Sequence, residues 1–236
     1  MPVACHVTCV HRSCYVSSSI CFWTPTGHVI LSGGKNGLVA VSSAVNGATI
    51  QIIRDHKGAQ INTIQCVTEE CKNFALEGKE MWLTASADRR VSVWAADWLK
   101  DKCDLMDWLT FPAPAYLEDD SPPPSLAAFC PTDPDLVVYT GYGVEKELSF
   151  YSLTKKQIIK KIALPHWATC FGLSKSQLIA VGSKERVLKL IKSSSGRFQD
   201  FLQHSDSLQT CHFSPTGTLF FTVAYNEILL WEVRGL

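Results

Sequence analysis

The chain has 236 residues, of which 46% are apolar and 19% charged. This composition is that of a globular protein and excludes an intrinsically disordered one. The 22 basic and 22 acidic side chains cancel, so net charge gives no reason to expect nucleic acid as a partner. No apolar run reaches the roughly 18 residues that a membrane-spanning helix needs, and we expect no membrane partner.

The first segment, residues 1–11, contains the strand-like stretch Val3–Val10. We predict that it closes the last repeat unit, which lacks a fourth strand, because closure removes an unpaired sheet edge. Cysteine and histidine are also zinc ligands, and the segment and its flank carry Cys5, His6, Cys9, His11 and Cys14. No second ligand pair follows downstream. The pattern therefore favours reduced, incidental thiols, and we predict no metal and no other cofactor.

A polar turn followed by a short apolar run recurs five times along the chain. The turns centre on Asn36, Asp88, Glu145, Glu185 and Asn226, and the runs begin at Leu38, Val91, Leu148, Leu188 and Ile228. Runs this short, rich in Leu, β-branched and aromatic residues and bounded by turn residues, predict β-strands. In three units a Phe and a Pro-containing turn precede these strands, and this predicts a further hairpin.

These repeats divide the chain into five expected units, 12–56, 57–121, 122–166, 167–204 and 205–236. Their spacing is near the ~40–45 residues of a propeller blade, apart from longer stretches at Glu69–Glu80 and Asp97–Pro124. In the second stretch we predict an outer strand over Leu105–Phe111 and then a rigid loop. The alternative is an amphipathic excursion that grips a partner through Trp98, Leu105, Trp108 and Leu109.

The most regular repeat is Met81–Trp98, which predicts a strand, a tight polar turn and a second strand. The order of Thr84, Asp88 and Trp94 within it resembles the WD-repeat family, whose unit is one four-stranded blade of a β-propeller. We therefore predict an all-β WD-repeat β-propeller of about five four-stranded units, which is incomplete or open if the missing repeats lie elsewhere.

The resemblance implies a hydrogen-bonded tetrad of His56, Thr84, Asp88 and Trp94. A buried indole N–H needs an acceptor, and the tetrad would satisfy it inside the blade. The alternative is an Asp–His–Thr catalytic triad, which is disfavoured because the hydroxyl would be buried rather than presented to a substrate. We thus predict no enzyme activity.

Elsewhere we expect only degenerate tetrads. The first unit has Ser42 in place of the Trp, the third has Glu145 with Tyr151, and the fourth has His166 with Glu185 and Ile191. The fifth has His204 and Trp231, with Tyr225 in the Asp position. The second unit is thus expected to hold the one intact tetrad.

Several segments of the second half are similar to the C-terminal propeller of a large WD-repeat family of the centriole and basal body wall. They are Tyr139–Tyr151, Leu164–Trp167, Val181–Arg186 and Glu227–Val233. The resemblance implies a protein-interaction scaffold in centriole wall architecture and cilium assembly. It also implies a cytoplasmic location at the cytoskeleton, the centrosome and the ciliary basal body.

The same resemblance implies centriolar or microtubule-associated protein partners. Family members carry an N-terminal microtubule-associated module that is absent here, so we expect this segment not to bind tubulin directly. The alternative is a general WD-repeat adaptor, such as a ubiquitin-ligase substrate receptor or a chromatin reader. Because loops on rigid scaffolds carry recognition, the candidate rim contacts are Asn36, Arg89, Arg90, Glu145, Glu185 and Arg186.

Overall fold

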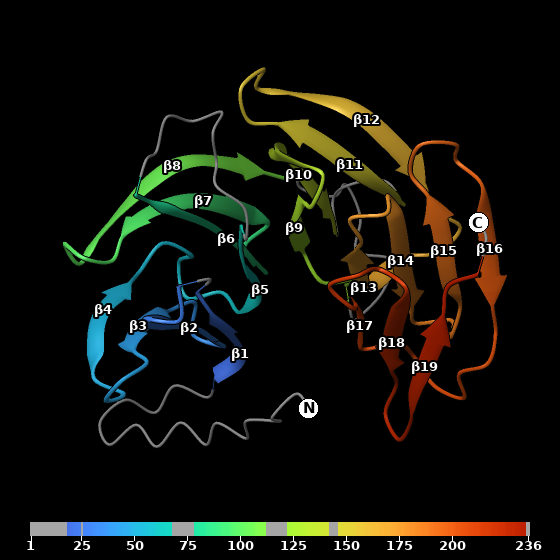
Figure 1. The fold of residues 1–236 in the computed structure, drawn as a ribbon, viewed down its shortest axis with the longest axis horizontal. Helices are drawn as coiled ribbons and strands as arrows, with labels where there is room; N and C mark the ends of the chain where they lie inside the picture. Colours follow the sequence, from blue (N-terminus) through green and yellow to red (C-terminus); the bar gives the residue numbers. More distant parts are fainter. Residues whose placement is uncertain (1–17, 25, 68–77, 112–121, 142–145, 235–236) are drawn as a thin grey trace.

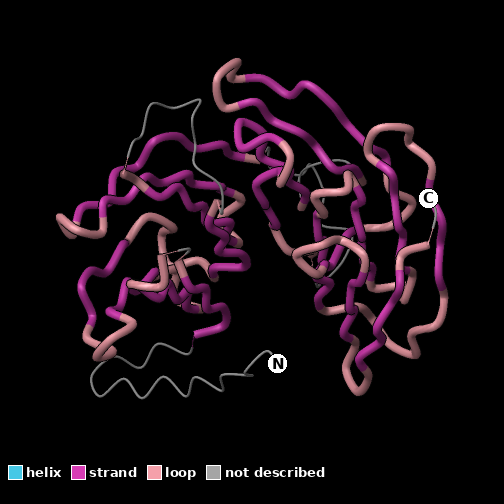
Figure 2. The backbone as a smooth tube through the Cα atoms, viewed as in Figure 1, coloured by secondary structure: helices cyan, strands magenta, loops and turns pink. Residues whose placement is uncertain are grey.

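The computed structural model describes residues 18–24, 26–67, 78–111, 122–141 and 146–234. All regular structure within these ranges is β, in nineteen strands, and Figure 2 shows strands joined by loops throughout. The predicted all-β class is confirmed. The predicted closing strand 1–11, the zinc alternative and Glu145 lie outside the described residues. The same ranges contain no helix with the length and hydropathy needed to cross a membrane.

The strands form five antiparallel sheets, each a simple meander in chain order. The first contains β1 (Ser18–Trp23), β2 (Val29–Gly34), β3 (Val39–Ser43) and β4 (Thr49–Ile53). The second contains β5 (Ile61–Cys66), β6 (Glu80–Ser86), β7 (Arg90–Asp97) and β8 (Lys102–Thr110). The third contains β9 (Leu126–Cys130), β10 (Asp133–Thr140), β11 (Glu147–Ser152) and β12 (Gln157–Ala163). The fourth contains β13 (Ala168–Leu173), β14 (Leu178–Ser183), β15 (Leu188–Lys192) and β16 (Phe198–Phe201). The fifth contains β17 (Thr210–Phe213), β18 (Leu219–Val223) and β19 (Ile228–Glu232).

The sheets pack face to face as successive blades of a propeller. Their inner strands β1, β5, β9, β13 and β17 follow one another in contact, and Figure 1 shows the sheets fanning outward from them. An apolar core fills each interface between successive sheets; in the first, Leu31 and Val41 pack with Trp82. Burial of these alternating side chains from both sheets is the main stabilising contribution.

The arc is open at the fifth sheet. This sheet has three strands among the described residues, whereas the other four have four. The face turned away from the fourth sheet carries apolar side chains, and Ile228 and Leu230 are 71% and 72% exposed. In Figure 1 the first and fifth sheets lie at the two ends of the arc. The structure is thus an open, propeller-like arrangement, as the repeat count suggested.

The outer strand of the second blade begins earlier than predicted. β8 starts at Lys102 and pairs with β7 through a bulge near Trp94. The alternative of a helical excursion across Leu105 and Trp108 is therefore wrong, because both residues lie in this strand. Their near-helical spacing is produced by the bulge, which adds one residue and shifts the strand's alternation.

Candidate functional site

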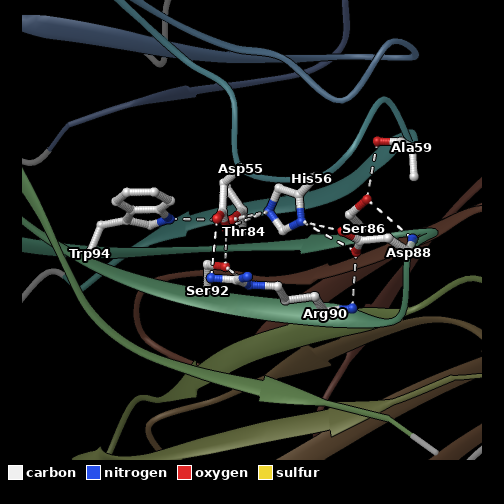
Figure 3. A network of polar contacts seen from close by, with 9 residues as sticks. All are labelled: Asp55, His56, Ala59, Thr84, Ser86, Asp88, Arg90, Ser92 and Trp94. Atoms are coloured by element: carbon white, nitrogen blue, oxygen red, sulfur yellow. Dashed lines mark hydrogen bonds and ion pairs between the residues drawn. The ribbon is translucent and has the colours of Figure 1, made fainter.

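A polar network crosses the second blade, as Figure 3 shows. His56 comes from the loop after β4, Thr84 from β6, Asp88 from the β6–β7 turn and Trp94 from β7. The His56 Nε2 atom lies 2.7 Å from Thr84 Oγ1, and its Nδ1 atom lies 3.2 Å from an Asp88 carboxylate oxygen. The Trp94 indole donates to Thr84 Oγ1 at 3.3 Å.

One proton arrangement satisfies every member of this network. Trp94 donates to the Thr84 oxygen, the Thr84 hydroxyl donates to Nε2 of His56, and Nδ1–H of His56 donates to Asp88. We therefore assign the neutral tautomer with its hydrogen on Nδ1. Such a chain leaves no donor of these four side chains without an acceptor, so it stabilises the core rather than weakening it.

The carboxylate of Asp88 also organises the turn. It accepts the backbone N–H of Arg90 at 3.0 Å. Partial burial pushes the pKa of Asp88 upward, but the hydrogen bond from His56, together with those from the Arg90 N–H and Ser86, outweighs it and holds the pKa below its usual value. Asp88 is thus held as a carboxylate that fixes the turn.

The network is unsuited to catalysis. Thr84 is 0% exposed, and His56 is buried as well. A nucleophilic hydroxyl must reach a substrate carbonyl, whereas this one is enclosed and already bonded on both sides. The geometry argues against the Asp–His–Thr triad and for a structural role.

Arg90, one of the predicted rim residues, makes a second set of contacts in this blade. Its guanidinium lies 3.1 Å from an Asp55 oxygen and donates to Ser92 Oγ at 3.0 Å. It also stacks 5.3 Å above the ring centre of Trp108. The contacts of Arg90 therefore lie within the second blade, and Figure 3 shows its side chain directed toward Ser92 and Asp55.

The fifth blade contains a second complete tetrad, so the prediction of a single one is wrong. His204 Nε2 lies 2.6 Å from Thr222 Oγ1, and Trp231 donates to the same oxygen at 2.7 Å. The acid is Glu227, whose Oε1 atom lies 3.1 Å from His204 Nδ1. Tyr225, expected in the acid position, is instead exposed to solvent.

Turn length explains the error. In the second blade the last ladder pair before the turn is Ala85 with Val91, and in the fifth it is Val223 with Ile228. Five residues therefore lie between the two paired residues in the second blade and four in the fifth. Counting back from Trp231 by the six residues that separate Asp88 from Trp94 gives Tyr225. Because the turn of the fifth blade is shorter, the acid is instead Glu227. The longer side chain of glutamate spans the remaining distance to His204.

Among the described residues, the first and fourth blades lack this arrangement. In the fourth, Val181 stands where the bridging hydroxyl would be and Ile191 replaces the Trp; both are buried. Its His166 and Glu185 are more than one-third exposed and lie 3.6 Å apart. In the first blade, Ser42 occupies the Trp position and is buried. These blades rely on apolar packing instead.

The remaining rim candidates lie in the turns that join the second and third strands of their blades. Asn36 is exposed, and its Oδ1 accepts the backbone N–H of Leu38 at 3.3 Å. Arg89 and Arg186 occupy equivalent turn positions with left-handed φ angles of 66° and 65°. Arg186 donates to the Ser205 carbonyl at 3.5 Å, and Glu185 is exposed beside it. These turns lie at the same ends of their blades.

A cavity of about 750 Å³ lies between the inner strands β5, β9, β13 and β17. Its lining mixes amide, hydroxyl and apolar side chains and contains no Asp, Glu, Lys or Arg. Desolvation by the surrounding strands lowers the pKa of His212 in this lining, although the side chain is still open to solvent, and this favours its uncharged form. An uncharged cavity of this kind suits hydrogen bonding to a neutral group.

The buried thiols are poor nucleophiles. Burial raises the pKa of Cys103 to about 12. Burial, aided by the nearby Glu80, raises the pKa of Cys66 still further, and contact with Cys170 together with burial raises that of Cys211. Since the thiolate is the reactive form, these residues act as small apolar core residues.

The comparisons with known proteins agree with this architecture. The family model described as WDR90, 4th beta-propeller, matches residues 9–236. WD repeat-containing protein 90 of Xenopus tropicalis is 48% identical over 228 residues, covering 96% of this chain and 12% of that protein. The Homo sapiens protein of the same name is 49% identical over 212 residues, covering 89% of this chain and 12% of that protein.

The fold has a solved counterpart. A chain in the crystal structure of the mitotic checkpoint complex superposes with a TM-score of 0.69 over 92% of this chain and 62% of that chain. The sequence identity is 16%, so the likeness concerns the fold alone. This chain spans about 12% of the length of the two relatives. On the strength of the family match and these identities, the chain belongs to the WDR90 family and corresponds to its fourth β-propeller.

Proposed function

We propose that this propeller segment is a non-catalytic scaffold that binds protein partners through the turns at one end of its blades. The observation that carries the proposal is the contrast between buried and exposed polar groups. The tetrads of the second and fifth blades are satisfied internally, whereas Asn36 and Arg186 are exposed on turns of that rigid support and Arg89 is partly exposed in the equivalent turn of the second blade. Exposed turns on a rigid β-scaffold are suited to recognition.

We further propose that the partners are centriolar or microtubule-associated proteins and that the scaffold acts in the centriole and basal body wall and in cilium assembly. The resemblance of segments such as Tyr139–Tyr151 and Val181–Arg186 to the centriole-wall family supports this placement. The names of the relatives state WD repeats and no location. The proposed location is cytoplasmic, at the centrosome and the basal body.

Proximity labelling with the tagged chain in ciliated cells tests this placement. We expect enrichment of centrosomal and tubulin-associated neighbours over a tagged, unrelated propeller of similar size. Neighbours dominated by cullin ligases or histones would contradict the proposal and favour the adaptor alternative. The unrelated propeller controls for enrichment caused by a β-propeller surface in general.

Direct binding to microtubules is not part of the proposed role. Because the net charge of the chain is zero, its long-range attraction to an acidic lattice should be weak. Any local attraction should fall as salt screens it, over a Debye length of about 8 Å at physiological ionic strength. Co-sedimentation with purified microtubules is the measurement. Tight binding that resists added salt would reveal a tubulin site and overturn this expectation.

A further inference from the structure

Net neutrality conceals an uneven distribution of charge along the chain. Asp55 is the first acidic residue, so the segment from β1 to β4 contains none. The basic residues up to the second blade are Arg12, Lys35, Arg54 and Lys57. Of these, Lys35, Arg54 and Lys57 lie in described segments and are exposed. Charge asymmetry of this kind indicates a charged partner.

The fold gathers Lys35, Lys57 and Arg89 at one place, which we call the basic edge. The β2–β3 turn with Lys35 packs on the loop that holds Lys57: a Cβ atom on Gly37 would lie 2.8 Å from the backbone N and O of Ala59. The same loop is tied to the turn that carries Arg89, because His56 bonds Asp88 at 3.2 Å. The three side chains therefore come from adjoining segments.

The acidic groups nearest the basic edge are already paired. Asp55 pairs with Arg90 and accepts from Ser92, and Asp88 accepts from His56. Lys35, Arg54, Lys57 and Arg89 form no ion pair with a carboxylate in the described ranges. Their positive charge is thus available to an external group.

Two of these cations occupy costly backbone positions. Lys57 and Arg89 have φ angles of 45° and 66°, a left-handed conformation that favours glycine or asparagine. The same conformation recurs at Asp101, Lys156, Gln177 and Arg186, so it is a property of these turns, and glycine can replace any of these residues without backbone strain.

We propose that the basic edge binds an acidic, Asp/Glu-rich segment of a protein partner. Charge complementarity selects the acidic class. Among the described residues, the basic edge has few cations and no exposed row of aromatic rings beside them. This favours a peptide over nucleic acid, whose binding uses many phosphate contacts and base stacking. This proposal rests on the scaffold function above and assigns it one contact surface and one class of partner.

The test uses the purified chain and a fluorescein-labelled glutamate-rich peptide, followed by fluorescence anisotropy. We expect binding that weakens as salt is raised. The double variant Lys57→Gly with Arg89→Gly should weaken it about tenfold, since exposed ion pairs each contribute a small factor. Glycine suits both φ angles, so this variant keeps the fold, which circular dichroism checks.

Lys156→Gly is the control, because Lys156 is an exposed cation with a left-handed φ angle of 55° in the β11–β12 turn of the third blade, away from the basic edge. It should leave peptide affinity unchanged. Absence of peptide binding, an unaffected double variant, or an equal loss in the control would each overturn the proposal. Tighter binding to a labelled single-stranded oligonucleotide than to the peptide would overturn it in favour of nucleic acid. Since the assay uses purified chain, its failure is distinct from a failure of the centriolar placement, which proximity labelling measures.

Discussion

The second and fifth blades contain the same tetrad in different surroundings. The second blade is packed between two neighbours, with apolar cores on both faces. The fifth has one packed face and one with exposed apolar side chains. The Asp88 side chain is 13% exposed, whereas that of Glu227 is 26% exposed. The comparison separates two causes: turn length decides which residue supplies the acid, and burial decides how much the network stabilises its blade.

The largest expected effect is that of removing the bridging hydroxyl. Thr84→Val leaves the buried Trp94 N–H without its acceptor and His56 without its donor, and should lower the free energy of unfolding by about 3 kcal/mol. Thr222→Val should cost less, about 1–2 kcal/mol, because the Trp231 side chain is only part-buried and water can replace part of the loss. Urea unfolding followed by tryptophan fluorescence measures both. Equal losses would contradict the role assigned to burial.

The second-largest expected effect on the free energy of unfolding is that of removing the Asp88 carboxylate. Asp88→Ala should lower the free energy of unfolding by about 1–3 kcal/mol, because it strands the donors of His56 and the turn. Asp88→Asn is the matched control for charge, since the amide oxygen still accepts one hydrogen bond. Urea midpoints for both variants check this. An unchanged urea midpoint in Asp88→Ala would contradict the structural role that we assign to the tetrad.

Turn length in the fifth blade can be tested directly. Glu227→Asp shortens the acid by one methylene in the four-residue turn and should lower the unfolding midpoint, because the carboxylate no longer reaches His204. In that variant, Asn226→Asp with one glycine inserted after it gives five turn residues with the acid in third place, as Asp88 has in the second blade, and should restore the midpoint. If the aspartate is tolerated without the insertion, the spacing explanation is wrong.

The smallest expected effect is on pH dependence. The pKa of Asp88 is held below its usual value in the folded chain, so between the two pKa values the folded state binds fewer protons than the unfolded state. Its contribution is therefore fully present above the unfolded pKa of about 3.9 and is lost as pH falls through the lowered folded value. Urea midpoints between neutral pH and pH 3 should fall less steeply in Asp88→Asn. An identical fall of the urea midpoint with pH in the wild-type chain and in Asp88→Asn would contradict the lowered pKa assigned to Asp88.

The sequence allowed the all-β repeat architecture to be predicted because each turn and the apolar run after it recur locally. The residues of the second-blade tetrad could be named because Thr84, Asp88 and Trp94 have the spacing of the family pattern. The Glu227 network was missed since that spacing assumes a constant turn length. The early start of β8 was missed because a bulge disturbed the alternation.

The basic edge could not be predicted from net charge. The total charge is zero, and only the packing of the β2–β3 turn on the loop after β4 brings Lys35 beside Lys57. One local signal was present: no acidic residue precedes Asp55. The position of Arg89 near these lysines depends on the hydrogen bond between His56 and Asp88, which joins the loop after β4 to the β6–β7 turn.

The central claim is that the tetrads hold the blades while exposed turns bind partners. Proximity labelling of cells that express the wild-type chain, Asp88→Asn or the Lys57→Gly with Arg89→Gly variant tests it most directly, alongside the urea midpoint of each purified chain. We predict that Asp88→Asn lowers the midpoint and keeps its neighbours among the fraction that remains folded, whereas the double variant keeps the midpoint and loses neighbours. A fully stable Asp88→Asn chain that loses its partners would contradict the claim.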